Sequence, residues 1–182
     1  MLPTLETPRL RLRPLAAADL PDLVALDLDP EVMRYVGSPA GVKTAAETLA
    51  RARTRIRETE GGENEPLGFW RVESSDGAFL GVAALMRMPD GLDVELAYRL
   101  ARAAWGRGVA TEAAGALVAH GLRTLGLPRL VAVTYPENRA SQRVLDKLGF
   151  ERRGLTEYKG VQTTFHVLTR EAWIDFVPGA PP

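Results

Sequence analysis

The sequence of 182 residues contains no cysteine and only two histidines, His120 and His166. Without cysteine there is no disulfide framework, no thiolate metal site and no cysteine nucleophile, and two histidines are too few for a multi-histidine metal centre. The longest apolar run, residues 80–86, is far shorter than the ~20 residues of a membrane-spanning helix. The N-terminus lacks the apolar stretch of a secretion signal. We therefore expect a soluble, cytoplasmic protein without a metal and without membrane association.

Neither sign of charge is in excess, because 23 basic and 23 acidic side chains balance, and this argues against a general nucleic-acid binder. The segment 99–153, however, has ten basic and four acidic residues and so a net charge of +6. A local positive field on a neutral protein suits a small, multiply charged anion better than a polymer. For any single arginine, a salt bridge to an acid elsewhere is an equally good interpretation.

Hydropathy patterning predicts a single domain of the α/β class over residues 1–176, with a frayed tail at 177–182. The strand–helix–strand segment 94–134 requires at least one parallel pair, so the sheet is expected to be mixed, with helices on its faces. The expected strands are residues 7–14, 67–74, 78–88, 93–100, 129–134, 150–156 and 163–169, and the expected helices are 19–28, 42–60, 109–125 and 138–148, with a further turn from Asp29–Pro30.

The helix predicted over residues 42–60 has apolar side chains at intervals of three or four residues from Ala45 to Ile56. That spacing places the apolar side chains on one inward face. Its four arginines, at every second position from Arg51 to Arg57, are expected to face mostly outward.

A glycine-rich turn, Trp105-Gly106-Arg107-Gly108, lies between a predicted strand and a predicted helix. Such a turn points free backbone N–H groups outward at the positive end of the helix dipole, where phosphate oxygens bind. It is not a P-loop, because no lysine lies near. It also departs from the dinucleotide fingerprint, since Thr111 replaces the third glycine and no acid follows about 20 residues later.

The run 99–113 resembles the acetyl-CoA pyrophosphate loop of the GCN5-related N-acetyltransferase (GNAT) superfamily, Gln/Arg-x-x-Gly-x-Gly/Ala, with Gly108 and Ala110 at matching positions. Trp105 replaces the usual Gln or Arg, as is common in the RimJ/RimL-like ribosomal-protein N-acetyltransferase branch, which residues 5–13, 29–33 and 138–150 also resemble. The resemblance implies the acyl-CoA N-acyltransferase fold with a centrally split sheet, and acetyl-CoA as co-substrate. The cofactor-binding residues that it implies are Leu100, Trp105, Gly106, Arg107, Gly108, Val109, Ala110, Thr111, Asn138 and Ser141.

Asn138 is a good N-cap for the following helix, bonding the N–H of Ser141, and Gly149 is a good stop for that helix. By resemblance, Asn138 and Ser141 also flank the pantetheine and the thioester. Ser141 is then a candidate donor to the leaving thiolate, although many relatives have tyrosine there. The resemblance further implies an oxyanion donor at a backbone N–H near a bulge around Tyr98 or Arg99, beyond which Leu100 pairs with the pantetheine.

Glu95 is the candidate general base, because it alternates with apolar neighbours in the strand 93–100 and partial burial would raise its pKa. An outward, solvated Glu95 or an ion pair with an arginine is the alternative, and Glu137, Glu73 or a water relay are further candidates for the base. Glu112 is expected to complement the helix dipole. The two histidines are expected to be structural.

These features predict an N-acetyltransferase that transfers the acetyl group of acetyl-CoA to a primary amine by direct attack. The alternatives are a non-catalytic acyl-CoA sensor or scaffold on the same fold and, with less support, a nucleotide-binding protein. The acceptor stays open between a protein N-terminal α-amine and a small-molecule amine, with specificity expected from residues 16–60 and the last strands. A homodimer through those strands is compatible with the pattern, but no residue indicates it.

Overall fold

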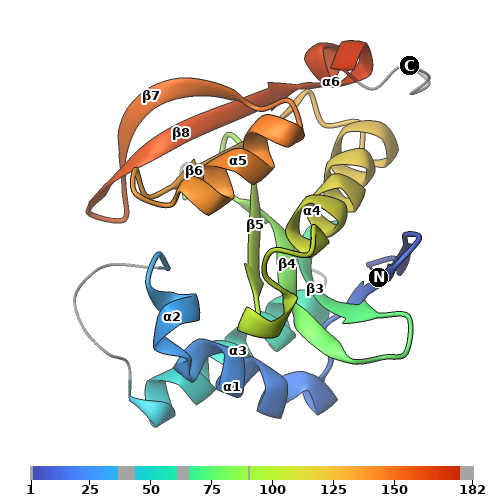
Figure 1. The fold of residues 1–182 in the computed structure, drawn as a ribbon, viewed down its shortest axis with the longest axis vertical. Coiled ribbons are helices and arrows are strands. Elements are labelled where there is room, and N and C mark those ends of the chain that lie inside the picture. The colour runs from blue at the N-terminus through green and yellow to red at the C-terminus, as the bar shows by residue number, and fades with distance from the viewer. Residues whose placement is uncertain (1, 37–43, 61–65, 90, 177–182) are drawn as a thin grey trace.

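The computed structural model describes residues 2–36, 44–60, 66–89 and 91–176. Its eight strands form one sheet in the order β1-β2-β3-β4-β5-β6-β8-β7, with helices on both faces (Figure 1). The strands are β1 (Leu5–Glu6), β2 (Leu10–Pro14), β3 (Gly68–Ser74), β4 (Phe79–Arg87), β5 (Val94–Leu100), β6 (Arg129–Thr134), β7 (Glu151–Tyr158) and β8 (Val161–Thr169). The helices are α1 (Leu20–Leu28), α2 (Pro30–Met33), α3 (Ala45–Glu60), α4 (Val109–Ala119), α5 (Arg139–Lys147) and α6 (Arg170–Phe176).

This architecture confirms the predicted mixed α/β fold, and the differences are local. The strand expected at 7–14 is divided into β1 and β2 by a turn in which Thr7 bonds the Leu10 carbonyl. The helix expected to Leu125 is α-helical only to Ala119 and continues as a π-helix over 120–124. The short α6 was not predicted. The predicted boundary at residue 176 stays a prediction, because the tail lies outside the described residues.

The sheet is split between β5 and β6, which run parallel but pair only at Glu95 and Val131. Beyond that pair the two strands separate toward their carboxyl ends, and the chain leaves β5 for α4 and β6 for α5. In an open α/β sheet, a ligand commonly binds where such strands end and diverge. The predicted bulge in β5 is wrong, because its register with β4 is unbroken from Gly81–Leu100 to Arg87–Val94.

Each face of the sheet carries its own core. On one face, Leu96 and Leu100 of β5 pack with α4 in the larger hydrophobic cluster. On the other face, Val82 and Ala84 of β4 pack with α1 and α3 in a smaller cluster. Since side chains alternate along a strand, Tyr98 lies on the α4 face of β5, whereas Glu95 and Arg99 lie on the α1 and α3 face.

No helix in the described part of the chain has the length and apolar character needed to cross a bilayer.

Candidate active site

The glycine-rich turn adopts the conformation that its sequence predicts. Gly106 and Gly108 have φ of 71° and 79°, and Gly108 is the left-handed N-cap of α4. A side chain at either position would be strained, because L-residues rarely adopt this region. A Cβ at Gly108 would also lie 3.2 Å from Nη2 of Arg9, whose Nη1 donates to the carbonyl of Arg107 at 3.0 Å.

The turn presents a row of free backbone donors. The N–H of Trp105 donates to Arg102 and that of Glu112 to Gly108. Between them, the N–H groups of residues 106–111 have no hydrogen-bond acceptor among the described residues. Residues 105–108 are exposed, Val109 is buried, and Ala110 and Thr111 are half-buried. The free N–H groups therefore begin at the surface, at the positive end of α4, where phosphate oxygens bind.

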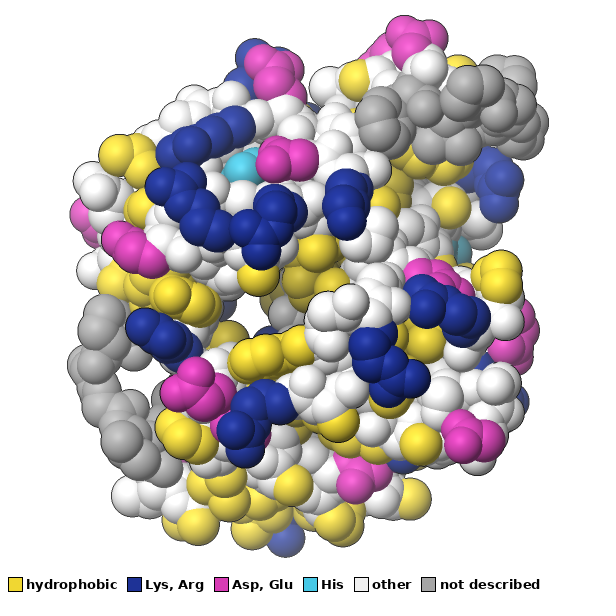
Figure 2. Space-filling model, viewed as in Figure 1, with side chains coloured by type: hydrophobic (Ala, Val, Ile, Leu, Met, Phe, Trp, Pro, Cys, Tyr) yellow, Lys and Arg dark blue, Asp and Glu magenta, His cyan; other side chains and the backbone are white. Residues whose placement is uncertain are grey.

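The positively charged segment 99–153 is partly neutralised. Arg99, Arg102, Arg129 and Arg153 form ion pairs with acids, whereas Arg107 has no acidic partner in the described part of the chain. Arg139, Arg143 and Lys147 are exposed at intervals of four residues along α5, and Figure 2 shows basic side chains gathered over this part of the surface. The same view shows the molecule hollowed between this region and that of α1 and α2.

Leu100 ends β5 beside the split. The N–H of Ala101 donates to Leu80, so alternation along the antiparallel ladder turns the N–H groups of Tyr98 and Leu100 away from β4 and toward the split. The indole of Trp105, 46% exposed, donates to the Leu100 carbonyl at 2.8 Å. Leu100 therefore has its N–H, but not its carbonyl, available for an added strand.

Asn138 and Gly149 have the structural roles predicted for them. Asn138 Oδ1 accepts from the N–H of Ser141 at 3.1 Å, and Gly149 ends α5 with φ of 85°. Ser141 lies in the first turn of α5 and faces β5, because its Oγ is 2.9 Å from the hydroxyl of Tyr98. Burial raises the pKa of Tyr98 to about 12, although the bond to Ser141 opposes this shift. Tyr98 therefore stays protonated at neutral pH. Its hydroxyl can donate to the Ser141 carbonyl at 3.3 Å, and either hydroxyl can be the donor in the bond between Tyr98 and Ser141 Oγ.

Glu95 lies where β5 and β6 separate, and its side chain is only 6% exposed. Burial raises its pKa, and the Tyr158 hydroxyl and the charge of Lys159 oppose the shift. Tyr158 donates to Oε2 of Glu95 at 2.7 Å, while no described residue donates to Oε1. An oxygen of a carboxylate with a raised pKa is thus left to accept a proton.

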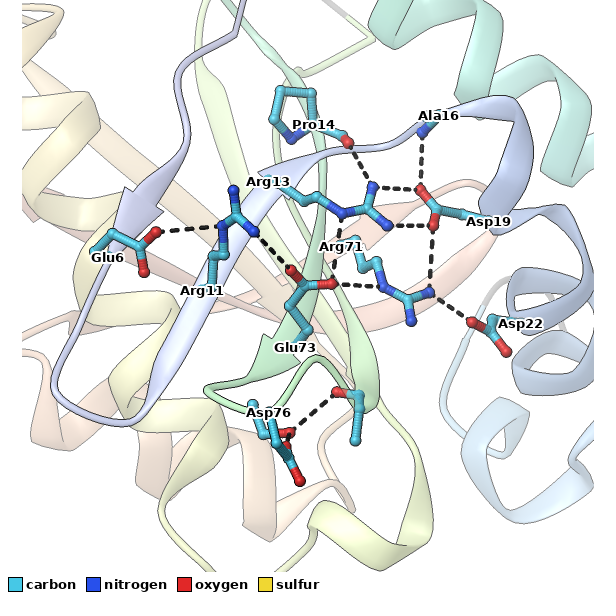
Figure 3. Close-up of polar contacts among 12 residues, drawn as sticks. Glu6, Arg11, Arg13, Pro14, Ala16, Asp19, Asp22, Arg71, Glu73 and Asp76 are labelled. Carbon is cyan, nitrogen blue, oxygen red and sulfur yellow. Dashed lines mark hydrogen bonds and ion pairs between the residues drawn. The ribbon is translucent and has the colours of Figure 1, made fainter.

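Of the other candidate acids, Glu73 and Glu112 are bound to basic or hydroxyl side chains, and Glu137 is at the surface. Glu73 contacts Arg11, Arg13 and Arg71 in an ion-pair network that joins β2, β3 and α1 (Figure 3), so it is not a free base. Glu112 accepts from the Thr7 hydroxyl and from Arg9, so it ties the N-terminal segment to α4 as well as lying at the dipole. Glu137 is exposed.

Both histidines are buried. His120 packs its ring edge-on against Trp70 with centroids 5.8 Å apart, and His166 lies 3.4 Å from the Thr134 hydroxyl. Burial lowers the pKa of each imidazole. Both therefore have the structural environment expected for them.

Two tyrosine hydroxyls at the split were missed as side-chain contributors. Tyr98 follows Glu95 by three residues, so its place on the opposite face of β5 follows from strand alternation alone. Its contact with Ser141, 43 residues away, depends on tertiary packing. Tyr158 reaches Glu95 from β7, and no local pattern indicates that approach.

The comparisons with known proteins agree with this geometry. A family model described as "Acetyltransferase (GNAT) domain" matches residues 9–151. An uncharacterized N-acetyltransferase of Bacillus subtilis, YoaA, is 32% identical over 160 residues, which cover 85% of this chain and 86% of that protein.

Among solved structures, an acetyltransferase from Agrobacterium tumefaciens superposes with a TM-score of 0.78 at 28% identity, covering 92% of this chain and 95% of the other. RimL, a ribosomal L7/L12 α-N-protein acetyltransferase solved in complex with coenzyme A, superposes with a TM-score of 0.76 at 20% identity, covering 93% and 99%. The predicted likeness to RimL is therefore one of fold.

Proposed function

Because the chain belongs to the GNAT family of acetyltransferases and is an acetyl-CoA-dependent N-acetyltransferase, we propose that it acetylates a primary amine by direct attack in a ternary complex. The observation that carries this proposal is the row of free N–H groups at residues 106–111, beside the split that holds Glu95 and Ser141. Acetyl-CoA supplies an activated acetyl group and a thiolate leaving group.

The residues at the split fit a CoA thioester. The free N–H groups of 106–111 and the Arg107 guanidinium would bind the pyrophosphate. Trp105 lies exposed at the start of this turn, and Asn138 lies beside the split at the start of α5. The free N–H of Leu100 would bond the pantetheine as an added strand does. The exposed arginines of α5 add positive charge to the same side.

Residues of β5 and α5 are proposed to stabilise the leaving thiolate and the oxyanion. Tyr98 is proposed to be the donor in its 2.9 Å bond to Ser141 Oγ, which leaves the Ser141 hydrogen free to turn toward the sulfur. A CoA thiol resembles cysteine, with a pKa of about 8.5, so one hydrogen bond suffices for thiolate departure. The Tyr98 backbone N–H, directed toward the split, is the proposed donor to the oxyanion.

Glu95 is proposed to remove a proton from the acceptor ammonium. The freed amine nitrogen forms a bond to the carbonyl carbon, the carbon–sulfur bond breaks, and the sulfur leaves as thiolate. The attacking nitrogen loses its second proton to solvent or to the thiolate. Since burial raises the pKa of Glu95, its carboxylate is a stronger base than a solvated one.

Thiol release from acetyl-CoA with a panel of amines, including peptide α-amines, tests this proposal. Glu95→Gln is expected to lower kcat by roughly 100-fold, the lower end for general-base catalysis, whereas the exposed Glu137→Gln serves as the control and retains the wild-type rate. Equal rates for wild type and both variants would contradict the role of Glu95. Coenzyme A binding without turnover of any amine would favour a sensor instead.

The roles of Tyr98 and Ser141 have their own test. If Tyr98 acts through Ser141, then Tyr98→Phe and Ser141→Ala each lower kcat by about tenfold, and the double variant is no slower than the slower single variant. Fully multiplicative effects would show that the two hydroxyls act independently.

The pH dependence of kcat/KM tests the proposed role of Glu95 as the base, with Tyr158 as the residue that is changed. Because Tyr158 lowers the Glu95 pKa, Tyr158→Phe is expected to move the acidic limb of kcat/KM to higher pH. An unmoved limb would assign the titration to another group.

A further inference from the structure

A second polar cluster lies on the α1 and α3 face of the sheet, apart from the residues used above. Asp27 of α1 accepts from Arg55 of α3 at 2.6 Å through Oδ2, and its Oδ1 lies 3.1 Å from Nη1 of Arg99. The side chains are 2%, 9% and 12% exposed, respectively. One buried carboxylate thus faces two buried guanidinium groups.

A third guanidinium leaves the cluster with excess positive charge. Arg51 lies one turn before Arg55 on α3, and its Nη1 is buried without a hydrogen-bond partner among the described residues. Burial and the charge of Arg55 lower the pKa of Arg51, and Asp27 only partly opposes them. Burial, Arg55 and Arg51 together lower the pKa of Arg99 to about 9, against the attraction of Asp27.

Excess buried charge is expensive, because an ion without a counterion loses its hydration and gains nothing in return. No other carboxylate of the described residues contacts these three arginines. The arrangement therefore has the character of a binding site whose counter-charge comes from a ligand.

The position of the cluster indicates which ligand. Arg99 and Glu95 point to the same face of β5, and their Cα atoms are four residues or roughly 13 Å apart along the strand. The phosphate-binding turn precedes α4, which packs on the opposite face. The counter-charge is therefore not a phosphate of the CoA bound at residues 106–111, and it lies on the same side as the proposed base.

We propose that Arg51, Arg55 and Arg99 bind an anionic group of the acceptor, a carboxylate or a phosphate, that lies within about 13 Å of the amine to be acetylated. This rests on the proposed function, because it places the amine at Glu95. Arginine suits the role, since its fork of donors pairs with both oxygens of a carboxylate or phosphate. A span of up to about 13 Å corresponds to no more than about four extended residues, so the acceptor class is a short anionic peptide or a small molecule of that length.

A matched pair of acceptors tests the proposal. The tripeptide Ala-Ala-Ala and its C-terminal amide have the same α-amine, but only the first has an anionic group at the required distance. The free acid is expected to show a kcat/KM at least about tenfold higher, the value of a charge-assisted hydrogen bond. Arg51→Gln is expected to lower kcat/KM for the acid toward that for the amide, and an aminoalkyl phosphate of equal length separates phosphate from carboxylate recognition.

The matched control is Arg53→Gln, an exposed arginine two residues along α3, which should retain the full preference for the acid. If wild type acetylates the amide as fast as the acid, or if Arg53→Gln loses the preference as fully as Arg51→Gln, the subsite does not exist.

Anion binding is also measured without turnover. Inorganic phosphate and succinate, added at constant ionic strength, should raise the unfolding temperature of wild type and Arg53→Gln by more than that of Arg51→Gln, in which only the turn at residues 106–111 is left to bind them. Equal shifts in all three proteins would overturn the proposal. If no amine is acetylated, the proposed function fails, whereas the Arg51-dependent shift still decides whether the anion site exists.

Discussion

Two arginine clusters lie on the same face of the sheet, and they differ in how their charge is balanced. In the first, which we call the balanced network, Arg11, Arg13 and Arg71 each contact at least two carboxylates, drawn from Glu6, Asp19, Asp22 and Glu73 (Figure 3). In the second, which we call the Asp27 cluster, Arg55 and Arg99 contact the single carboxylate of Asp27, and Arg51 has a buried nitrogen without a hydrogen-bond partner among the described residues.

The locations of the clusters explain the difference. The balanced network fastens β2 and β3 to α1, away from the split, where satisfied charges hold elements in register. The Asp27 cluster includes Arg99 of β5, beside the split. Uncompensated charge lowers stability and persists at functional sites, so an excess of arginine beside the split is a functional signal, whereas an equal number of arginines in the balanced network is structural.

The largest expected effect on stability comes from replacing the central acid of each cluster, Asp27 or Asp19. Asp27→Asn removes the carboxylate that Arg55 and Arg99 contact, so it should lower the free energy of unfolding by about 4 kcal/mol. Asp19→Asn should cost about 2 kcal/mol, because Arg13 and Arg71 keep Glu73 as a partner. Urea unfolding measures both, and a greater loss for Asp19→Asn would reverse the comparison.

Removing an arginine should change stability in opposite directions in the two clusters. Arg71→Gln leaves buried acids unpaired and should cost about 3 kcal/mol. Arg51→Gln removes a charge that has no partner among the described residues, so it should raise the free energy of unfolding by about 1 kcal/mol. Thermal unfolding in an anion-poor buffer measures whether each variant is less or more stable than the wild type. Destabilisation by Arg51→Gln of the same size as by Arg71→Gln would mean that Arg51 is satisfied.

The pH dependence of stability sharpens the comparison within the balanced network. Burial alone would raise the pKa of Asp19, but hydrogen bonds from Arg13 and from the Ala16 N–H outweigh it, and the pKa lies below its ordinary value. The stability that Asp19 contributes is thus present above the unfolded pKa of about 3.9 and is lost as the pH falls through the lower folded value.

Asp19→Asn should therefore reduce the slope of stability against pH below about pH 4, as measured by urea unfolding at a series of acidic pH values. The surface variant Asp175→Asn is the control, and an unchanged slope in Asp19→Asn would exclude Asp19 from acid unfolding.

The smallest expected effect concerns the exposed arginines of α3. Arg53→Gln and Arg57→Gln should each change the free energy of unfolding by no more than about 0.5 kcal/mol, since their side chains are solvated. If either variant changed the free energy of unfolding as much as Arg51→Gln does, the position of the arginine on the helix, and not its burial, would determine the effect on stability.

Local sequence predicted much of the fold. The meander of β3, β4 and β5, the caps at Asn138 and Gly149 and the left-handed glycines of residues 105–108 all follow from short patterns whose energetics are local. The site was partly predictable for the same reason, because the free N–H groups depend on Gly106, Gly108 and the first turn of α4.

Alternation along α3 was a poor guide to its arginines. All four were expected to face mostly outward, yet Arg55 is buried against Asp27 and Arg51 has a buried nitrogen. A helical pattern gives the direction of a side chain relative to its neighbours. It does not reveal that an acid of α1 and an arginine of β5 approach the same edge of the helix.

The sequence by itself determined the elements, the turn that presents backbone donors and the alternation that puts Glu95 and Tyr98 on opposite faces of one strand, because these depend on neighbours within a few residues. Only the tertiary structure decided the partners of these side chains: Tyr158 on Glu95, Ser141 on Tyr98, and Arg55 and Arg99 on Asp27. Each of these contacts joins residues 28 or more positions apart, and the balance of charge in a buried site depends on every element that packs there.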